Sequence, residues 1–424
     1  MSARGPRELV VFAEAFGRHP SSIQHLVRAM ARLEPGLRVL WVELPQRSPQ
    51  FALRDFGRAV QRLGAMRGGR VAGGGASTAS DLVRLAPPAL PWRSPAPLAG
   101  LSDRVATVFV RRALQRHGFV APAGIVVLPA AAGVAVALGL RPLVFYRADD
   151  FALWPGVDPA AVRRDEASLL ARAELVVAPA AHLLPRGARR ELLLPHAIDP
   201  IFVAGTEVAS RARSREDAGP PTSAAFAAPL ADPLRPTVGA VSGLSVKAAF
   251  AAPLADLPRP RLLFAGLIDD RLDFDLLVST LDALPAAQLV LLGPCALPAR
   301  RLPRHPRLVI RPAVGLDELP RWLHAAEVLL LPYRRTPLGN SLAPLKLREC
   351  IATGVPVVAT ALPEAVGLGR DLVRIGDGSF FTDAVRDALR EPAGARAARV
   401  HALAAETWDQ RAVRLLEALA RLSL

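Results

Sequence analysis

Cysteine is scarce in this chain, with only two in 424 residues. Cys295 and Cys350 lie far apart in sequence, and neither belongs to a CxxC pair or a Cys/His cluster. A disulfide framework and a zinc site are therefore not expected, and a reducing cytoplasm fits best. Aromatic residues make up 5% of the chain, and no segment interleaves them with basic residues, so nucleic acid is the weakest candidate partner.

Long apolar runs are also scarce. The run from Leu9 to Phe12 is too short for a signal peptide, and Glu14 interrupts the stretch. Residues 118–140 are uncharged and long enough to span a bilayer, but alanine and glycine dominate them and two prolines interrupt them. A buried strand at 125–128 followed by a short helix explains them better. We expect a cytoplasmic protein, with any membrane contact peripheral, on the inner face of the cytoplasmic membrane.

Positive charge and apolar residues are abundant. Lys plus Arg number 53 against 38 Asp plus Glu, and this net charge of +15 attracts anionic partners such as phosphates or an acidic membrane surface. Hydrophobic residues make up 51%, and the length suffices for two or three domains. Nearly all the basic residues are arginine, since the only lysines are Lys247 and Lys346. A lysine at 346 suggests a need for a compact ammonium rather than a planar fork.

Strand and helix patterns alternate along both halves of the chain, which predicts an α/β protein with two parallel sheets. Short apolar runs predict strands at 9–13, 39–44, 125–128, 143–147, 175–178 and 192–194, and then at 261–265, 288–292, 307–310, 328–331, 355–359 and 372–375. Residues 45–105 give no clear order of elements. The predicted parts are a first domain at 1–202, a linker with a short duplication at 203–258, a second domain at 259–405 and a final helix at 406–424.

The segment from Pro337 to Val358 carries the strongest functional pattern. Small and polar residues lead to Pro344, a helix is expected from there to Gly354, and a buried strand follows. A helix start presents free backbone N–H groups, so Lys346 in its first turn completes a site for a diphosphate. Glu349 lies one turn further on, where its carboxylate can accept hydrogen bonds from ribose hydroxyls. The alternative is a core helix on which Lys346 and Glu349 form an exposed pair.

This Pro-Leu-Lys-x-x-Glu-(x)4-Gly-x-Pro-Val-Val arrangement resembles the donor-binding segment of GT-B glycosyltransferases, in particular the family 4-like bacterial enzymes of exopolysaccharide synthesis. The resemblance implies the GT-B architecture, in which two Rossmann-like domains face each other across a cleft and a C-terminal helix returns to the first domain. It also implies a nucleotide-diphospho sugar as donor, bound near Leu345, Lys346 and Glu349, with no metal and no other cofactor.

Other positions in the second domain fit this resemblance, and one departs from it. Residues 263–275 resemble the family's Gly-x-Ile-x-x-Arg-x-Asp pattern, which places Gly266 and Arg271 at the donor phosphates; a tight turn with capping acids is the alternative. Tyr333 either lies near the nucleotide or donor sugar or packs as an ordinary aromatic at a strand end. Ser341 stands where many family 4 enzymes carry a second glutamate, so the stereochemical course stays open, although Ser341 could still hold the donor.

In the first domain, Asp149 and Asp150 follow a predicted strand, in a segment that resembles the Asp-Asp-Phe motif of the same enzymes. Either aspartate could take the proton of the acceptor hydroxyl in an inverting transfer. The alternative is that they cap the following turn, because Asp is a common N-cap residue.

The loop after the first strand contains the run Gly-Arg-His-Pro-Ser-Ser, which resembles a run in the exopolysaccharide enzymes. The resemblance makes four of its residues candidate ligands of an acceptor's diphosphate: Arg18, His19, Ser21 and Ser22. A plain N-cap at Ser21 or Ser22 is the alternative.

Arg54, Arg58 and Arg62 share one face of a candidate amphipathic helix, which could lie on anionic lipid near a polyprenyl-linked acceptor or simply face solvent. The sequence thus predicts a hexosyltransferase-like, metal-independent glycosyltransferase. It would move a sugar from a nucleotide-diphospho sugar to a glycan or lipid-linked acceptor, in exopolysaccharide or cell-surface glycan synthesis. The alternative is a non-catalytic GT-B-like protein that binds a nucleotide or serves as a scaffold.

Overall fold

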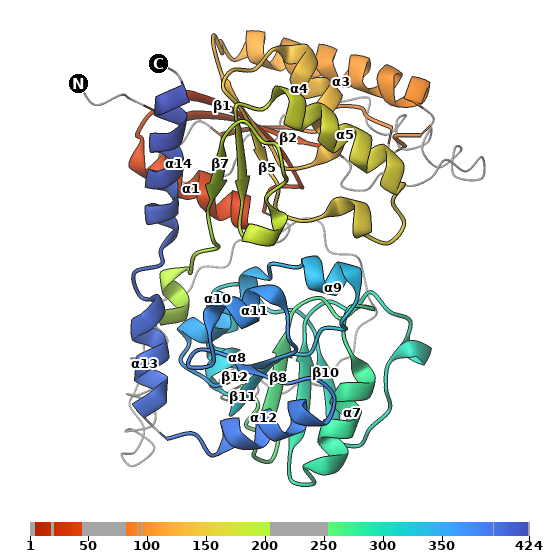
Figure 1. Ribbon diagram of the computed structural model, residues 1–424, viewed down its shortest axis with the longest axis vertical. Helices are drawn as coiled ribbons and strands as arrows, with labels where there is room; N and C mark the ends of the chain where they lie inside the picture. Colours follow the sequence, from red (N-terminus) through yellow and green to blue (C-terminus); the bar gives the residue numbers. More distant parts are fainter. Residues whose placement is uncertain are drawn as a thin grey trace, which may run out of the picture.

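Two parallel sheets organise the protein (Figure 1). The computed structural model describes residues 5–17, 21–44, 82–90, 92–94, 96–203, 253–392 and 394–422. In the first sheet the strand order is β3-β2-β1-β4-β5-β6-β7, so the direction of winding reverses between β1 and β4, as in Rossmann-like domains. The strands are β1 (Glu8–Ala13), β2 (Arg38–Glu43), β3 (Leu82–Leu85), β4 (Ala123–Val126), β5 (Leu143–Tyr146), β6 (Leu175–Ala178) and β7 (Glu191–Leu193).

Helices cover both faces of the first sheet, because alternate side chains of its strands point to opposite sides and both sides are apolar. Leu9 and Val11 of β1 pack with α1 and α14, whereas Val10 and Phe12 pack with α3, α4 and α5. The first domain is therefore a three-layer α/β/α domain. Its helices are α1 (Ser22–Leu33), α3 (Ala96–Arg116), α4 (Ala132–Leu138), α5 (Pro159–Arg172) and α14 (Trp408–Leu422).

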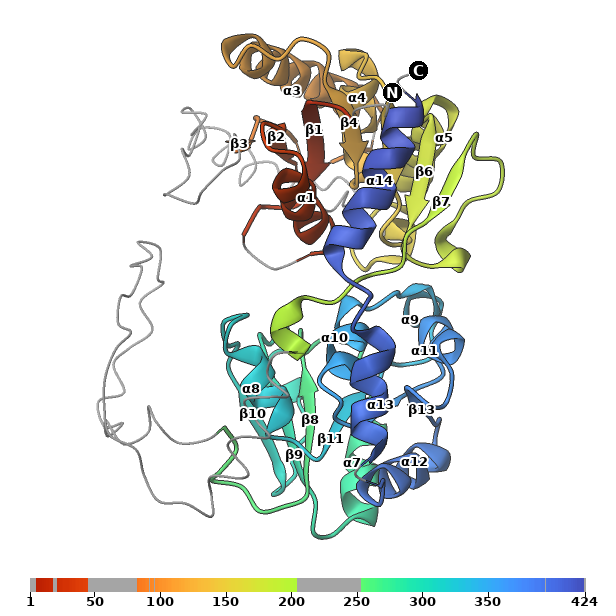
Figure 2. The same ribbon diagram turned by 90° about the vertical axis from the view of Figure 1, so that its left-hand side faces the viewer.

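The last of these helices, α14, follows the second domain in sequence but lies beside α1 (Figure 2). The His25 ring of α1 stacks on Trp408 with a centroid separation of 5.2 Å. Arg32 and Asp409 form an ion pair at 2.6 Å. The C-terminal helix thus completes one face of the first domain.

The second sheet has the strand order β10-β9-β8-β11-β12-β13, again with parallel neighbours. Its strands are β8 (Arg261–Ala265), β9 (Gln288–Leu292), β10 (Leu308–Arg311), β11 (Val328–Leu331), β12 (Val357–Ala359) and β13 (Arg374–Ile375). The helices of this domain are α7 (Phe274–Ala283), α8 (Leu319–His324), α9 (Pro337–Ser341), α10 (Leu345–Ala352), α11 (Pro363–Leu368), α12 (Ser379–Leu389) and α13 (Gly394–Leu403).

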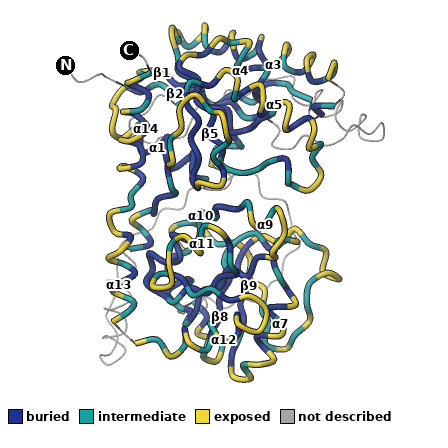
Figure 3. Tube along the Cα trace, in the orientation of Figure 1, coloured by how far each residue is buried: buried dark blue, intermediate teal, exposed yellow. Residues whose placement is uncertain are grey.

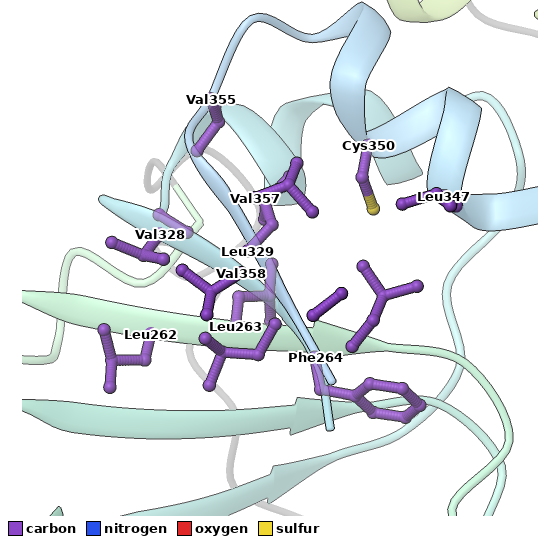
Figure 4. Close-up of a cluster of buried hydrophobic side chains, with 14 of the residues drawn as sticks. Leu262, Leu263, Phe264, Val328, Leu329, Leu347, Cys350, Val355, Val357 and Val358 are labelled. Atoms are coloured by element: carbon purple, nitrogen blue, oxygen red, sulfur yellow. The ribbon is translucent and has the colours of Figure 1, made fainter. Parts of the chain in front are cut away.

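The apolar core of the second domain fixes the position of α10. Leu347 and Cys350 point from α10 toward the strands that carry Phe264 and Val358, and all four residues are buried (Figure 4). Figure 3 shows the same burial along the strands of both sheets. Because α10 is held by its buried face, its first turn has a defined place at the carboxyl end of the sheet.

Each predicted strand is present, with small shifts at its ends. Two features differ from the prediction. The 45–105 region, for which the sequence gives no order, contributes β3 and the start of α3. The small and polar segment before Pro344, in which no helix is predicted, contains the short helix α9. The Thr336 hydroxyl accepts a hydrogen bond from Gly339 N at 3.0 Å, and Pro337 takes the first helical position. The domain boundaries stay predictions, and most of the linker lies outside the described residues.

Residues 118–140 contain a strand and a short helix, as the sequence predicts. They include β4, the 3₁₀ turn η1 (Pro129–Ala131) and α4. Within the described part of the chain, no helix is both long enough and apolar enough to cross a bilayer. Cys295 is exposed, Cys350 is buried, and both thiols are free.

Candidate active site

Residues that follow strands of both sheets meet between the two domains. His182, after β6, donates a hydrogen bond from Nε2 to the Ser341 carbonyl at 3.1 Å. His196, after β7, donates from Nε2 to the Ala343 carbonyl at 2.9 Å. Ser341 and Ala343 lie just before α10, so the first domain holds the segment that leads to Lys346. In parallel α/β sheets, this end of the strands is where ligands bind.

Lys346 lies in the first turn of α10. Its ammonium is 4.5 Å from the centroid of the Phe264 ring and 5.8 Å from that of the Tyr333 ring. Cation–π contacts of this kind position an ammonium without neutralising it. The side chain is only half-buried, so its positive charge stays available to an anion at the start of the helix.

Gly266 is required by the position of Lys346. A Cβ at residue 266 would lie 1.7 Å from Lys346 Nζ, and the φ of +147° also disfavours other residues. The sequence predicts that the space above Gly266 admits a donor phosphate; in the structure the lysine ammonium fills it. Gly293, after β9, packs directly against Gly266, since a Cβ there would lie 2.1 Å from the Gly266 carbonyl oxygen. The sequence interpretation misses Gly293, although a glycine directly after an apolar run is the same signal that identifies Gly266.

Glu349 is buried, with 7% of its surface exposed. Burial raises the pKa of its carboxyl to about 7; the nearby Lys346 charge opposes this shift and the Asp199 charge adds to it. Among the described residues, none donates a hydrogen bond to this carboxylate. The burial contradicts the alternative of an exposed Lys346/Glu349 pair, and it leaves a carboxylate that can accept bonds from hydroxyl groups.

Arg271 lies on the loop after β8 and reaches toward the first domain. Its Nε and Nη2 bond to the Asp269 carboxylate at 3.0 and 2.9 Å. The guanidinium also lies over the ring of Trp154, a first-domain residue, 5.5 Å from the ring centroid. The predicted donor-side arginine is therefore in contact with the segment that carries the two aspartates.

The remaining donor-side candidates lie around this cluster. Tyr333 is 3% exposed and packs edge-on against Phe264 at 6.2 Å between centroids, which favours its interpretation as a core aromatic. The Ser341 hydroxyl donates to the Leu338 carbonyl at 2.8 Å. Leu345 packs against the core of the first domain. Contact of these three residues with a donor stays a prediction.

The Asp150 carboxylate is bonded to groups within the first domain. Its carboxylate caps the 3₁₀ turn η2 (Phe151–Leu153) by accepting a hydrogen bond from Ala152 N at 3.3 Å. It also forms ion pairs with Arg163 at 2.9 Å and Arg147 at 3.4 Å. The capping alternative therefore describes Asp150 well.

Asp149 has a different environment, although it is the neighbouring residue. No described residue forms an ion pair or a hydrogen bond with its carboxyl. Burial raises its pKa to about 7, although the positive charges of Arg271 and Arg147 oppose the shift. The Asp149 carboxyl is free of the internal bonds that hold Asp150, and its raised pKa suits a general base, so Asp149 is the better candidate for that role.

The candidate acceptor residues that the structure describes are already hydrogen-bonded. Ser21 Oγ donates to the Glu14 carboxylate, and Ser22 is hydrogen-bonded to the hydroxyl of Tyr146. Gln24 Nε2 donates to the same Glu14 oxygen at 3.0 Å. The sequence interpretation misses this use of Glu14, a residue directly after β1, which puts a negative charge beside Ser21. A diphosphate at Ser21 would have to overcome that charge.

Other predicted residues lie outside the described residues: Arg18, His19, Arg54, Arg58 and Arg62. Among the residues that the structure does describe, no three His, Cys, Asp or Glu side chains gather so as to hold a metal ion. The independence of a metal stays a prediction.

Comparison with known proteins supports the relationship that the motifs predict. Residues 259–391 match the family model described as "Glycosyl transferases group 1". A Bacillus subtilis (strain 168) protein named as a teichuronic acid biosynthesis glycosyltransferase, TuaH, is 30% identical over 104 residues, which are 24% of this chain and 26% of TuaH. The match thus spans about a quarter of that relative.

Solved structures match nearly the whole chain. Sucrose-phosphate synthase from Thermosynechococcus elongatus has a TM-score of 0.63 at 15% identity, with 98% of this chain and 99% of the other covered. Anabaena HepE, solved in complex with UDP and glucose, has a TM-score of 0.59 at 11% identity, with 97% and 99% covered. At such identities the likeness establishes the fold. These findings confirm the predicted α/β GT-B architecture and leave family 4 a prediction: the chain has the GT-B fold, and residues 259–391 of its second domain match the group 1 glycosyl transferase model.

Proposed function

We propose that this protein transfers a sugar from a nucleotide-diphospho sugar to a glycan or lipid-linked acceptor in the synthesis of a cell-surface glycan. The observation that carries the proposal is that Arg271 of the second domain packs on Trp154 and lies close enough to Asp149 to lower its pKa. Lys346 lies on the same side of the second domain, 5.8 Å from the ring centroid of Tyr333, whose hydroxyl also interacts with Arg271. Two positive groups and a carboxyl group of near-neutral pKa are the set that such a transfer needs.

The donor diphosphate binds at the start of α10, between Lys346 and Arg271, and the Glu349 carboxylate accepts hydrogen bonds from the ribose. The acceptor hydroxyl lies near Asp149. As the acceptor oxygen bonds to the anomeric carbon, the bond from that carbon to the diphosphate oxygen breaks. The hydroxyl proton passes to Asp149, and the charge that develops on the diphosphate is stabilised by Lys346 and Arg271.

The similar proteins support a nucleotide-sugar donor and a role in the synthesis of a cell-surface glycan. HepE is a GT-B neighbour solved with UDP and glucose, and TuaH carries a teichuronic acid name. A UDP-sugar is therefore the first donor to try, and an anionic or lipid-linked saccharide is the first acceptor. Peripheral contact with the inner face of the cytoplasmic membrane would bring the enzyme to a polyprenyl-linked acceptor, and the net charge of +15 favours such contact.

The experiment incubates the purified protein with UDP-, GDP-, ADP- and dTDP-sugars and measures release of the nucleoside diphosphate, with and without polyprenyl-linked saccharides. We expect one class of donor to turn over, and to do so faster when an acceptor is added. The turnover should persist when EDTA is present. Lys346→Ala should slow that turnover by about 10²-fold. Arg421→Ala is the matched control, because it removes a cation from a side chain that is 74% exposed on α14.

A non-catalytic nucleotide-binding role is the second candidate, and Ser341 in the place of a second glutamate favours it. Tight binding of UDP or GDP without turnover across all donors and acceptors would contradict the proposed transferase and support this alternative.

A further inference from the structure

Arg271 is held from two directions, one within its own domain and one from the other domain. Asp269 bonds its Nε and Nη2, which fixes one edge of the guanidinium. Trp154 of the first domain faces the guanidinium at 5.5 Å from the ring centroid. Among the described residues, Nη1 has no hydrogen-bond partner. One edge of the fork therefore stays open for an anion, with its direction set by the two contacts.

The backbone of Arg271 is equally well placed. Its carbonyl accepts a hydrogen bond from Arg334 N at 2.8 Å, and the next residue, Leu272, forms an antiparallel bridge with Tyr333. The loop that carries Arg271 is thus tied to the strand end beside Lys346. What remains to be fixed is the rotamer of the long side chain, and that is where Trp154 acts.

Trp154 is itself firmly supported in the first domain. It directly follows η2, whose N-cap is Asp150, and Asp150 is held by Arg163 and Arg147. Its ring also stacks on Phe151 with a centroid separation of 6.1 Å. Asp150 and Trp154 therefore lie in one short segment held by ion pairs and by ring packing, while the indole Nε1 of Trp154 is buried without a hydrogen-bond partner among the described residues.

We propose that Trp154 is a positioning residue that sets Arg271 against both the donor diphosphate and Asp149, and does so only while the two domains are together. A cation over an aromatic face gains most when both are partly removed from water, as they are here. When the domains separate, Arg271 loses this face and keeps only Asp269. Through Trp154, the first domain therefore holds the Arg271 guanidinium in the orientation that binds the donor. This inference rests on the proposed transferase function.

The pH dependence supplies a readout that a merely structural role would not change. Burial raises the pKa of Asp149 most strongly; of the charged groups that act on it, Arg271 and Arg147 lower the pKa and Asp150 raises it. If Trp154 holds Arg271 near Asp149, removal of the ring lets that positive charge move away. As long as the Asp149 carboxyl stays buried, the loss of that charge raises its pKa, and the acid limb of the kcat profile moves to higher pH.

The test compares Trp154→Ala, Trp154→Phe and Arg271→Ala in the full chain, with the donor identified by the sugar panel and UDP as the binding probe. We expect Trp154→Ala to lower kcat/KM for the donor by about 5- to 30-fold, and Trp154→Phe to restore most of it because the aromatic face remains. The double variant Trp154→Ala/Arg271→Ala should be little worse than Arg271→Ala alone, because both remove the same interaction. The acid limb should move upward in Trp154→Ala. Trp322→Phe, on α8, is the control for loss of a tryptophan elsewhere.

The outcomes separate this inference from the function on which it rests. If the wild type turns over and Arg271→Ala is impaired, but Trp154→Ala keeps normal kinetics and an unmoved acid limb, the inference fails and the transferase stands. Additive losses in the double variant would also overturn the inference. If the wild type itself shows no turnover, the proposed function fails first. A drop in thermal stability of Trp154→Ala with unchanged kinetics assigns the ring a structural role only, against the inference.

Discussion

The second-domain half of the candidate site and the first-domain half differ in how their polar groups are used. On the second-domain side, Lys346 rests on two aromatic rings and Glu349 is buried, with no donor to its carboxylate among the described residues. On the first-domain side, Ser21 is bonded to Glu14, and Asp150 is bonded to two arginines and a backbone amide.

This difference separates groups ready to bind from groups that hold the structure. A buried polar group without a partner is costly, so it persists where a ligand satisfies it. A group with several internal partners must give them up before it can bind anything. Asp149 is half-buried and has no ion-pair or hydrogen-bond partner among the described residues, so we group it with Lys346 and Glu349 as a residue available to a ligand. Asp150 and Ser21 have internal partners and belong to the scaffold.

The largest expected effect comes from the aspartate pair. Asp149→Asn should lower kcat by about 10³-fold with little change in thermal stability, because a general base is lost while the shape is kept. Asp150→Asn should instead lower the melting temperature by weakening its ion pairs, with kcat reduced less than about tenfold. Kinetics and thermal unfolding of both variants check this contrast, and equal kcat losses would erase the distinction between the two halves.

The next effect is that of the lysine. Lys346→Ala should lower kcat/KM for the donor by about 10²-fold, because it removes one charge aimed at the departing diphosphate. Lys346→Arg should recover little, since a planar guanidinium does not fit the space above Gly266 that the ammonium fills. Steady-state kinetics with the best donor measure both variants. Full activity in Lys346→Arg would show that only charge matters there.

Sequence alone predicts much of this fold, because both sheets are built from short apolar runs between helices. It also identifies Lys346 and Glu349 from the helix-start pattern, and the pair Asp149 and Asp150 from the resemblance of their segment to a family motif, without choosing between the two aspartates. It does not predict partners that depend on the tertiary structure. The bond from Ser21 to Glu14 and the pairing of Asp150 with Arg163 arise only when strand ends and helices are placed in space. The short helix α9, by contrast, depends on local sequence only, because Thr336 is its N-cap and Pro337 its first residue.

A smaller effect is expected from pH acting on Glu349. Its pKa of about 7, against an ordinary value of 4.5, means that the ribose-binding carboxylate forms mainly above pH 7. Donor affinity should therefore be about tenfold higher at pH 8 than at pH 6, because the donor's diphosphate does not titrate in this range. Calorimetric titration of the donor at both pH values measures this. Glu349→Gln should bind more weakly and lose the pH dependence; the same pH dependence in that variant would point to another group.

The same raised pKa predicts that the stability of the fold falls as the pH rises, whereas donor affinity increases. A carboxyl with a raised folded-state pKa contributes stability below pH 4.5 that is lost as the pH rises through about 7. Glu349→Gln should therefore be more stable than the wild type at pH 8 and nearly equal to it at pH 4.5. Chemical unfolding at the two pH values checks the sign, and a variant that is less stable at pH 8 would show that the carboxylate is internally satisfied.

The smallest effect is expected at the contact between the domains. His182→Ala removes one hydrogen bond, from an exposed ring to the Ser341 carbonyl, and should change donor KM by about two- to threefold with kcat nearly constant. His196→Ala, which removes a buried bond to the neighbouring Ala343 carbonyl, should cost more. Kinetics of the pair test whether the first domain positions the segment before Lys346, and indistinguishable variants would argue against that role.

The most direct measurement of the central claim is a crystal structure of the protein with a bound nucleoside diphosphate, UDP first. We expect the diphosphate at the start of α10, within hydrogen-bond distance of Lys346 Nζ and Arg271 Nη1, and we expect the ribose hydroxyls to donate to Glu349. A nucleotide bound elsewhere, or one whose diphosphate lies at Ser21 in the first domain, would contradict the central claim.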